Sequence, residues 1–257
     1  MARIRAGFFE SLKVHMHYGE AVMQIKGKVV LVTGANRGLG KQFVKSLLDA
    51  GASKVYAAAR NPDSVDIEGA QAIRLDVTNA ADIAQAAAKY ADVQVVINNA
   101  GALTRGALLD HASTQGVRDL IEVNAIGPLN VTQAFAPMLR KNGGGAVVNV
   151  LSVLSWVVLP DGGAYSVSKS AAWAVTNALR DELRGQGTLV VGVHPGYIDT
   201  DMVAEVTAPK TSPASVVEQV LAAIERDEEE VLVDDTGRAV KQSLSTQTPI
   251  YITGVPR

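Results

Sequence analysis

The chain has 257 residues, of which 47% are hydrophobic and 19% are charged, a composition typical of a folded protein with a large core. Its net charge of -2 provides no overall attraction to nucleic acid or acidic lipid, and the absence of cysteine excludes disulfide bonds, cysteine nucleophiles and thiolate metal sites. No apolar run approaches the roughly 18 residues of a membrane span, and the N-terminus lacks the apolar segment of a secretory signal. We therefore expect a cytoplasmic protein with no nucleic-acid or membrane partner.

Short runs of Val, Ile, Leu and Ala alternate with longer segments of helical periodicity after residue 26. The short runs predict strands at residues 28–33, 54–59, 72–75, 94–98, 146–150, 188–193 and 230–233. The segments between them predict helices at residues 39–48, 80–90, 115–141, 165–185 and 213–226. This alternation predicts an α/β fold: a doubly wound, seven-stranded parallel sheet of the Rossmann-like type, with helices on both faces.

Both ends of the chain fall outside this pattern. No linker or repeat divides the rest, so we expect a single Rossmann-like domain at residues 23–240, an N-terminal extension at 1–22 and a C-terminal tail at 241–257. The two ends have mixed polarity, and we expect them to be disordered or loosely packed. Because Met23 stands where the pattern begins, we expect residues 1–22 to be dispensable.

A glycine-rich segment, Gly34-Ala-Asn-Arg-Gly-Leu-Gly40, lies between the first predicted strand and the first predicted helix. In this position one glycine turns the chain, one lets the backbone approach a pyrophosphate and one lets the helix pack closely. The N-terminus of the helix adds unpaired N–H groups and a partial positive charge. This placement favours a dinucleotide site over an ordinary turn. The candidate contacts are Gly34, Asn36, Arg37, Gly38, Leu39 and Gly40.

Charge at this site indicates which dinucleotide is bound. An NAD site usually presents an acidic residue at the end of the second strand, about 20 residues after the glycines. The second predicted strand here ends instead at Arg60, and Arg37 lies inside the glycine-rich segment. Two guanidinium groups suit the 2′-phosphate of NADP(H), the alternative being that both are solvated surface residues. We predict NADP(H) as the cofactor.

Tyr165 and Lys169 stand one helical turn apart at the start of a predicted helix, so their side chains share a face. A tyrosine with its ordinary pKa of about 10 is a poor base at neutral pH, and we expect the nearby ammonium to lower that pKa. Such a phenol can donate a proton to a carbonyl oxygen or accept one from an alcohol. Ser152 follows the strand at 146–150, at the sheet edge where α/β folds bind ligands, and can hydrogen-bond the same oxygen. Ser155 is a weaker alternative.

Several motifs occur together and in one order: Thr33–Gly40, Asp76–Val77, Asn98–Gly101, Asn124, Ser152, Tyr165–Lys169 and Pro195–Gly196. On these motifs the sequence resembles the short-chain dehydrogenase/reductase family over about residues 23–233. The resemblance implies an oxidoreductase with the catalytic residues Asn124, Ser152, Tyr165 and Lys169. Tyr165 would be the general acid/base, Ser152 would polarise the substrate carbonyl, and Lys169 would hold the nicotinamide ribose. Asn124 would position a water that passes protons to Lys169.

The same resemblance implies further cofactor contacts. Around the adenosine these are Asp76, Val77, Asn98, Ala100 and Gly101, and around the nicotinamide they are Pro195, Gly196, Ile198 and Thr200. In similar proteins a basic residue at the position of Arg60 accompanies a preference for NADP. Relatives commonly form dimers or tetramers through two long helices. The tail after residue 233 departs from the family pattern, and the N-terminal extension has no counterpart in it.

The loop between Ser152 and Tyr165 is nearly all apolar, so we expect it to form one wall of a substrate pocket. The candidate lining residues are Leu154, Trp156, Tyr197 and Met202. An apolar pocket fits a hydrophobic aldehyde or ketone, although Trp156 and its neighbours also suit packing against another subunit. The four histidines show no metal-ligand spacing, and we expect no metal.

The sequence thus predicts an NADPH-dependent carbonyl reductase, reversible as an alcohol dehydrogenase and assembled as a homo-dimer or homo-tetramer. Two alternatives stay open: a non-catalytic dinucleotide-binding regulator on the same fold, and an NAD-linked alcohol dehydrogenase. The presence of all four catalytic residue types favours an enzyme.

Overall fold

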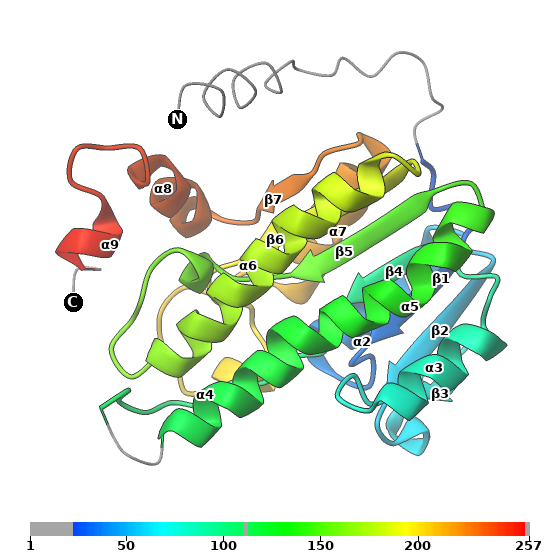
Figure 1. Ribbon diagram of the computed structural model, residues 1–257, viewed down its shortest axis with the longest axis horizontal. Helices are drawn as coiled ribbons and strands as arrows, with labels where there is room; N and C mark the ends of the chain where they lie inside the picture. Colours follow the sequence, from blue (N-terminus) through cyan, green and yellow to red (C-terminus); the bar gives the residue numbers. More distant parts are fainter. Residues whose placement is uncertain (1–22, 110–112, 255–257) are drawn as a thin grey trace, which may run out of the picture.

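The computed structural model describes residues 23–109 and 113–254 (Figure 1). Within them lies a seven-stranded parallel sheet with the order β3-β2-β1-β4-β5-β6-β7, which confirms the predicted fold class. The strands are β1 (Val29–Thr33), β2 (Lys54–Ala59), β3 (Gln71–Arg74), β4 (Val95–Asn98), β5 (Gly145–Val150), β6 (Thr188–His194) and β7 (Glu230–Leu232). The strand order reverses between β1 and β4, and α/β sheets of this kind bind ligands at the carboxyl edge beside such a reversal.

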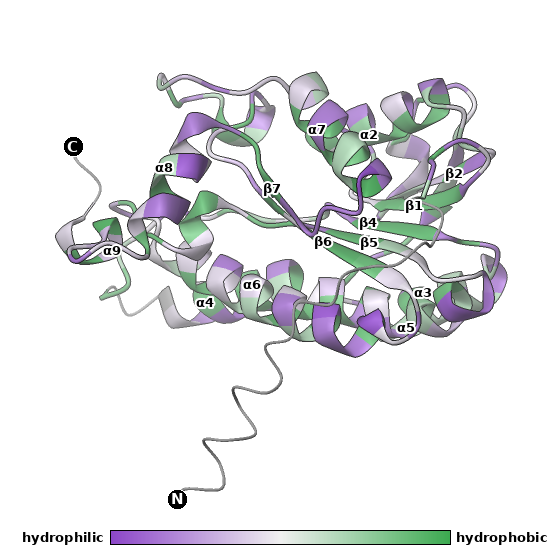
Figure 2. Ribbon diagram, turned by 90° about the horizontal axis from the view of Figure 1, so that it is seen from above, coloured by the Kyte–Doolittle hydropathy of each residue, from purple (hydrophilic) through white to green (hydrophobic). Residues whose placement is uncertain are grey.

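Helices cover both faces of the sheet. They are α2 (Gly38–Asp49), α3 (Ala80–Lys89), α4 (Ser113–Ile121), α5 (Gly127–Lys141), α6 (Gly163–Arg184), α7 (Pro213–Glu225), α8 (Asp235–Ser243) and α9 (Ile250–Thr253). In Figure 2, α2 and α7 lie on one side of the strands and α3, α5 and α6 on the other. Successive residues of β1 show why the strands are apolar throughout: Val30 and Val32 pack in the core under α2 and α7, and Leu31 packs in the core on the opposite face.

The long helix expected at residues 115–141 is interrupted in the structure. A π-helical turn, η2 (Glu122–Ile126), separates α4 from α5. This turn buries Asn124, which is 2% exposed and hydrogen-bonds to the backbone of Ala102. The inserted turn therefore aims a polar side chain inward from a helix, and π-helical turns often lie at functional sites.

The C-terminal tail differs from the sequence-based expectation of a loosely packed end. The boundary expected at residue 240 falls inside α8, and Val240 is 5% exposed. Val240 packs with Trp156 and Val157, and Leu244 and Ile250 pack against the same cluster. Burial of these few apolar side chains holds the tail on the domain. Residues 1–22 and 255–257 lie outside the described residues, so the expectations for them stay predictions.

Membrane-spanning helices and metal-binding clusters are two features that the described residues lack. None of their helices combines the length and the apolar character needed to cross a membrane. The same residues contain no group of three or more histidine, aspartate or glutamate side chains arranged to hold a metal ion.

Candidate functional site

The glycine-rich segment turns the chain from β1 into α2. Gly34 and Gly38 have φ angles of +63° and +53°, in the left-handed region that favours glycine. A Cβ on Gly34 would lie 2.9 Å from the Cα of Ala100, and a Cβ on Gly40 would collide with the carbonyl oxygen of Gly34. Backbone thus packs on backbone here, which leaves no room for side chains at these positions.

The N-terminus of α2 offers hydrogen-bond donors beside this turn. Arg37 is the N-cap residue, and its side chain makes no capping hydrogen bond. The first N–H groups of a helix have no partner within the helix and carry a partial positive charge. Asn36 is half-buried and Leu39 is buried, so the loop is anchored on both sides of Arg37. The turn and the helix end fit the pyrophosphate of a dinucleotide.

Two exposed arginines lie near this turn. Arg60 directly follows β2, and Arg37 is 4.0 Å from the carboxylate of Asp201. The charge of Arg60 also reaches Asp76, just beyond β3. The pKa of Asp76 is held below its usual value mainly by a hydrogen bond from the backbone of Thr78, with smaller effects from Arg60 and Arg74. Arg60 and Asp76 therefore lie near each other at one edge of the sheet, and their contacts with an adenosine stay a prediction.

The segment after β4 connects the glycine turn to the sheet. The Asn98 side chain donates to Asn149 Oδ1 at 2.9 Å, so Asn98 supports the sheet from within. Asn99, which the sequence analysis did not single out, donates to the carbonyl oxygens of Thr33 (2.9 Å) and Gly34 (3.1 Å). The N–H of Ala100 donates to Thr33 Oγ1. Asn99 thus stabilises the conformation of the glycine turn. Its position inside the Asn98–Gly101 motif is the feature of the sequence that could have identified it.

The structure brings the four candidate catalytic residues together. Ser152 follows β5, Tyr165 and Lys169 occupy the first turns of α6, and the Lys169 Nζ atom is 5.7 Å from the centroid of the Tyr165 ring. Asn124 donates to Ser168 Oγ at 2.9 Å, and Ser168 Oγ donates to the Tyr165 carbonyl at 2.7 Å. The π-helical turn is therefore hydrogen-bonded to the part of α6 that carries Tyr165 and Lys169.

The pKa of Tyr165 is shifted in the direction opposite to the one expected from the sequence. Burial raises the pKa of Tyr165 to about 12, and its interaction with the Ser152 side chain opposes this only in part. Burial also lowers the pKa of Lys169 to about 8. Lys169 donates to the carbonyl oxygen of Val150 at 2.7 Å and is not aimed at the phenol oxygen, so desolvation outweighs the charge of the ammonium. Tyr165 is a protonated phenol at neutral pH, as a tyrosine with the ordinary pKa of about 10 also is.

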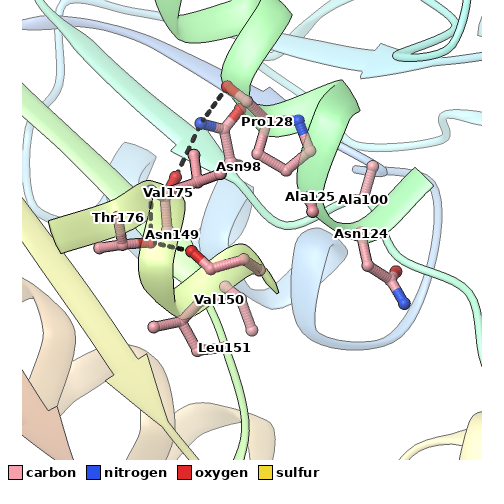
Figure 3. A pocket seen from close by; sticks show the side chains of 11 residues that line it. Asn98, Ala100, Asn124, Ala125, Pro128, Asn149, Val150, Leu151, Val175 and Thr176 are labelled. Carbon is pink, nitrogen blue, oxygen red and sulfur yellow. Dashed lines mark hydrogen bonds between the residues drawn. The ribbon is translucent and has the colours of Figure 1, made fainter. Parts of the chain in front are cut away.

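A small cavity of about 10 Å³ lies among β4, β5, η2 and α6 (Figure 3). Asn98, Asn124, Asn149 and Val150 are among its lining residues. Asn98 Oδ1 is buried and has no hydrogen-bond partner among the described residues, although Figure 3 shows the amide nitrogen of the same side chain bonded to Pro128 and Asn149. A cavity of this size is at the lower limit of the space that one water needs.

The loop after β6 lies beside both the Ser152 segment and the glycine turn. The carbonyl of Pro195 accepts a hydrogen bond from the N–H of Val153 at 3.0 Å, next to Ser152. Ile198 forms a bridge with Thr211. The Thr200 Cγ2 atom would lie 3.4 Å from a Cβ on Gly38, so Thr200 packs over the glycine turn.

The predicted substrate-pocket residues do not share one environment. Trp156 is 9% exposed and stacks on His194 with ring centroids 3.9 Å apart, so it packs against the C-terminal part of the chain and is not presented to a substrate. Leu154 and Tyr197 are half-buried, and Met202 is exposed on η4 (Asp201–Val203). The sequence could not show this because β6 and α8, which surround Trp156, are remote in the chain.

Comparison with known proteins places this site in a family. A family model described as short chain dehydrogenase matches residues 28–211. L-fucose dehydrogenase of Mus musculus is 31% identical over 211 residues, which covers 79% of this chain and 77% of that protein. Short chain dehydrogenase tazN of Aspergillus terreus is 34% identical over 198 residues, but the chain covers only 43% of its length.

A solved structure extends the comparison to three dimensions. The crystal structure of a short chain dehydrogenase from Burkholderia cenocepacia in complex with NADP is similar with a TM-score of 0.84 and 39% identity, covering 88% of this chain and 95% of that one. The family match contains the glycine turn, Ser152 and the Tyr165–Lys169 helix. The chain therefore belongs to the short-chain dehydrogenase/reductase family and is an NAD(P)-dependent oxidoreductase.

Proposed function

We propose that this protein is an NADPH-dependent reductase of a hydrophobic aldehyde or ketone, reversible as an alcohol dehydrogenase. The observation that carries the proposal is the arrangement of Tyr165, Ser152 and Lys169 at the carboxyl edge of the sheet. The Ser152 side chain interacts with the Tyr165 side chain, and Lys169 Nζ lies 5.7 Å from the centroid of the Tyr165 ring. A proton donor beside a hydroxyl group suits the oxygen of a carbonyl that is being reduced.

Each residue of the site has a role in this proposal. A nicotinamide bound at this site would supply a hydride to the carbonyl carbon. Tyr165 gives its proton to the carbonyl oxygen, and Ser152 donates a hydrogen bond to that oxygen as charge develops on it. Lys169 would bind the nicotinamide ribose, and its pKa of about 8 would let it return a proton to Tyr165 near neutral pH. The cavity beside Asn124 has room for a water that supplies Lys169.

The cofactor preference rests on charge. Arg60 and Arg37 provide two cations where an NAD site would provide a carboxylate, and this supports NADP(H). The relative from Burkholderia cenocepacia was solved in complex with NADP, which agrees with this choice. The pyrophosphate would lie at Gly34, Asn36, Gly38, Leu39 and Gly40, the adenosine at Asp76, Val77, Ala100 and Gly101, and the nicotinamide at Pro195, Gly196, Ile198 and Thr200.

Exposed apolar side chains support a hydrophobic substrate. Leu109 in the loop between β4 and α4, Val158 in the loop before α6, and Met202 in η4 are 97%, 58% and 46% exposed. The first loop lies beside the start of α6, because a Cβ on Gly163 would meet Leu108. We also propose that the chain forms a homo-dimer or homo-tetramer through its long helices, as relatives commonly do.

The test is a screen for NADPH oxidation over aldehydes, ketones and diketones, with Tyr165→Phe as the matched variant. We expect turnover with hydrophobic carbonyls. In the variant, which lacks only the proton donor, turnover should fall by roughly 10²–10⁴-fold while NADPH binding persists. Tight NADPH binding without turnover on any compound would favour a regulator, and faster turnover with NADH would favour an NAD-linked dehydrogenase.

A further inference from the structure

One carboxylate, that of Asp234, joins the loop after β6 to helix α8. Asp234 Oδ2 accepts a hydrogen bond from the N–H of Gly196 at 2.7 Å, and Asp234 Oδ1 accepts one from the N–H of Gly237 at 2.8 Å. Asp234 is the N-cap residue of α8, so the second bond is an ordinary helix cap. The first bond is not required by the cap and connects two segments that are far apart in the sequence.

Close approach at both ends makes this connection specific. A Cβ on Gly196 would lie 2.9 Å from Asp234 Oδ2, and a Cβ on Gly237 would lie 3.0 Å from the carbonyl oxygen of His194. Any side chain at either glycine would therefore separate α8 from the loop. Because an ionised carboxylate accepts stronger hydrogen bonds than a neutral group, Asp234 holds both amides firmly.

The loop that Asp234 holds is itself bonded to the Ser152 segment. The N–H of Val153 donates to the carbonyl of Pro195 at 3.0 Å, and the His194 Nδ1 atom lies 3.3 Å from the carbonyl oxygen of Ser152. A chain of hydrogen bonds therefore runs from the start of α8 through the loop to the residues around Ser152.

We propose that Asp234 is a positioning residue of the reaction. Through its hydrogen bond with Gly196 it fixes the conformation of the loop after β6, which flanks the nicotinamide end of the cofactor site. It thereby couples the position of α8 to that site. The inference rests on the proposed function, in which this loop flanks the nicotinamide. Asp234 acts through Gly196 and needs no contact with cofactor or substrate.

The key variant is Asp234→Ser, which separates the two hydrogen bonds. Serine is among the best N-cap residues, so the cap of α8 is kept. Its single, shorter hydroxyl cannot also accept from Gly196. Asp234→Asn is the conservative variant, because its one carbonyl oxygen can serve either amide. Asp235→Ser is the matched control, since the Asp235 side chain is fully exposed and pairs only with Arg238 among the described residues.

Three measurements on the full chain decide the question: the free energy of unfolding, amide hydrogen exchange at Gly196 and in α8, and the Kd for NADPH with the kcat of the best substrate. In Asp234→Ser we expect faster exchange at Gly196, unchanged protection of α8 and NADPH binding weaker by about tenfold or more. We expect kcat to fall with it, and Asp234→Asn to recover part of both losses. The control should match the wild type.

Two results would overturn the inference. One is an Asp234→Ser variant whose Gly196 amide exchanges faster while Kd and kcat equal those of the control. The other is a loss of α8 protection that alone accounts for the weaker binding in both Asp234 variants. Wild-type protein that binds neither NADPH nor NADH would overturn the proposed function first, and that result is visible before any variant is made.

Discussion

Single residues show how burial changes the chemistry that a side chain presents. Tyr165 and Lys169 share a helix face, yet desolvation raises the pKa of the tyrosine and lowers that of the lysine. In both cases burial disfavours the charged form of the side chain. The raised pKa keeps the tyrosine protonated but makes it a weaker acid, and the lowered pKa lets the lysine exchange a proton near neutral pH. The lowered pKa of Lys169 suits the supply of a proton, and the raised pKa of Tyr165 is opposite to the shift that the helical spacing led us to expect.

The arginine at the end of β2 gives a prediction at this scale. Replacing Arg60 by aspartate removes a cation that suits the 2′-phosphate and adds repulsion, so the Kd for NADPH should rise by roughly 10–100-fold. The Kd for NADH should change little or improve. Fluorescence titration with both dinucleotides measures this, and Arg226→Asp, at the far end of α7, controls for net charge. Equal losses for the two cofactors would exclude a contact between Arg60 and the 2′-phosphate.

At the scale of elements, the strands were predicted to within one or two residues. The five inner strands are mostly apolar runs buried on both faces, a signal that needs no knowledge of neighbours, whereas the edge strand β3 buries only Ile73. The π-helical turn was not predictable, because η2 continues the helical periodicity on either side. Helix α8 was missed since it has few apolar residues, and Val240 acquires its importance only from Trp156 and Val157.

The packing of α8 can be tested directly. Val240→Ala removes buried methyl groups between α8 and the Trp156 loop, so the free energy of unfolding should fall by roughly 1–3 kcal/mol. Gln242→Ala, on the exposed side of the same helix, should have almost no effect. Urea unfolding of the two variants provides the comparison. Similar stabilities for both would mean that the tail is not packed as the structure shows.

For the whole molecule, His194 lies where the last parallel strands, the Trp156 loop and the tail meet. It is 1% exposed, and burial lowers its pKa to about 4 despite the Ser152 carbonyl and Glu230, which raise it. Lys241 and Arg180 add to the lowering. Protonation at this position is therefore unfavourable in the folded protein but ordinary in the unfolded chain.

This difference predicts a loss of stability in acid. Between the unfolded pKa of 6.5 and the folded pKa of about 4 the unfolded chain binds more protons, so the free energy of unfolding falls as the pH drops through this range. At about 1.4 kcal/mol per pKa unit, the loss is about 3 kcal/mol. In His194→Gln the difference in stability between pH 7 and pH 4.5 should be smaller by about that amount. Carboxylates titrate in both proteins, so an identical pH dependence would show that His194 is not buried as a neutral group.

The amino-acid sequence by itself determined the parallel sheet and the glycine turn, and it supplied the candidate catalytic residues. These depend on local properties: apolar runs, glycines at a strand end, a helix start, and chemical groups at fixed spacing. Tertiary structure alone decided the direction of the Tyr165 and Lys169 pKa shifts, the packing of Trp156 on His194 and the double hydrogen bond of Asp234. Each of these depends on which remote segments exclude water from a side chain or meet it, and only the folded chain brings those segments together.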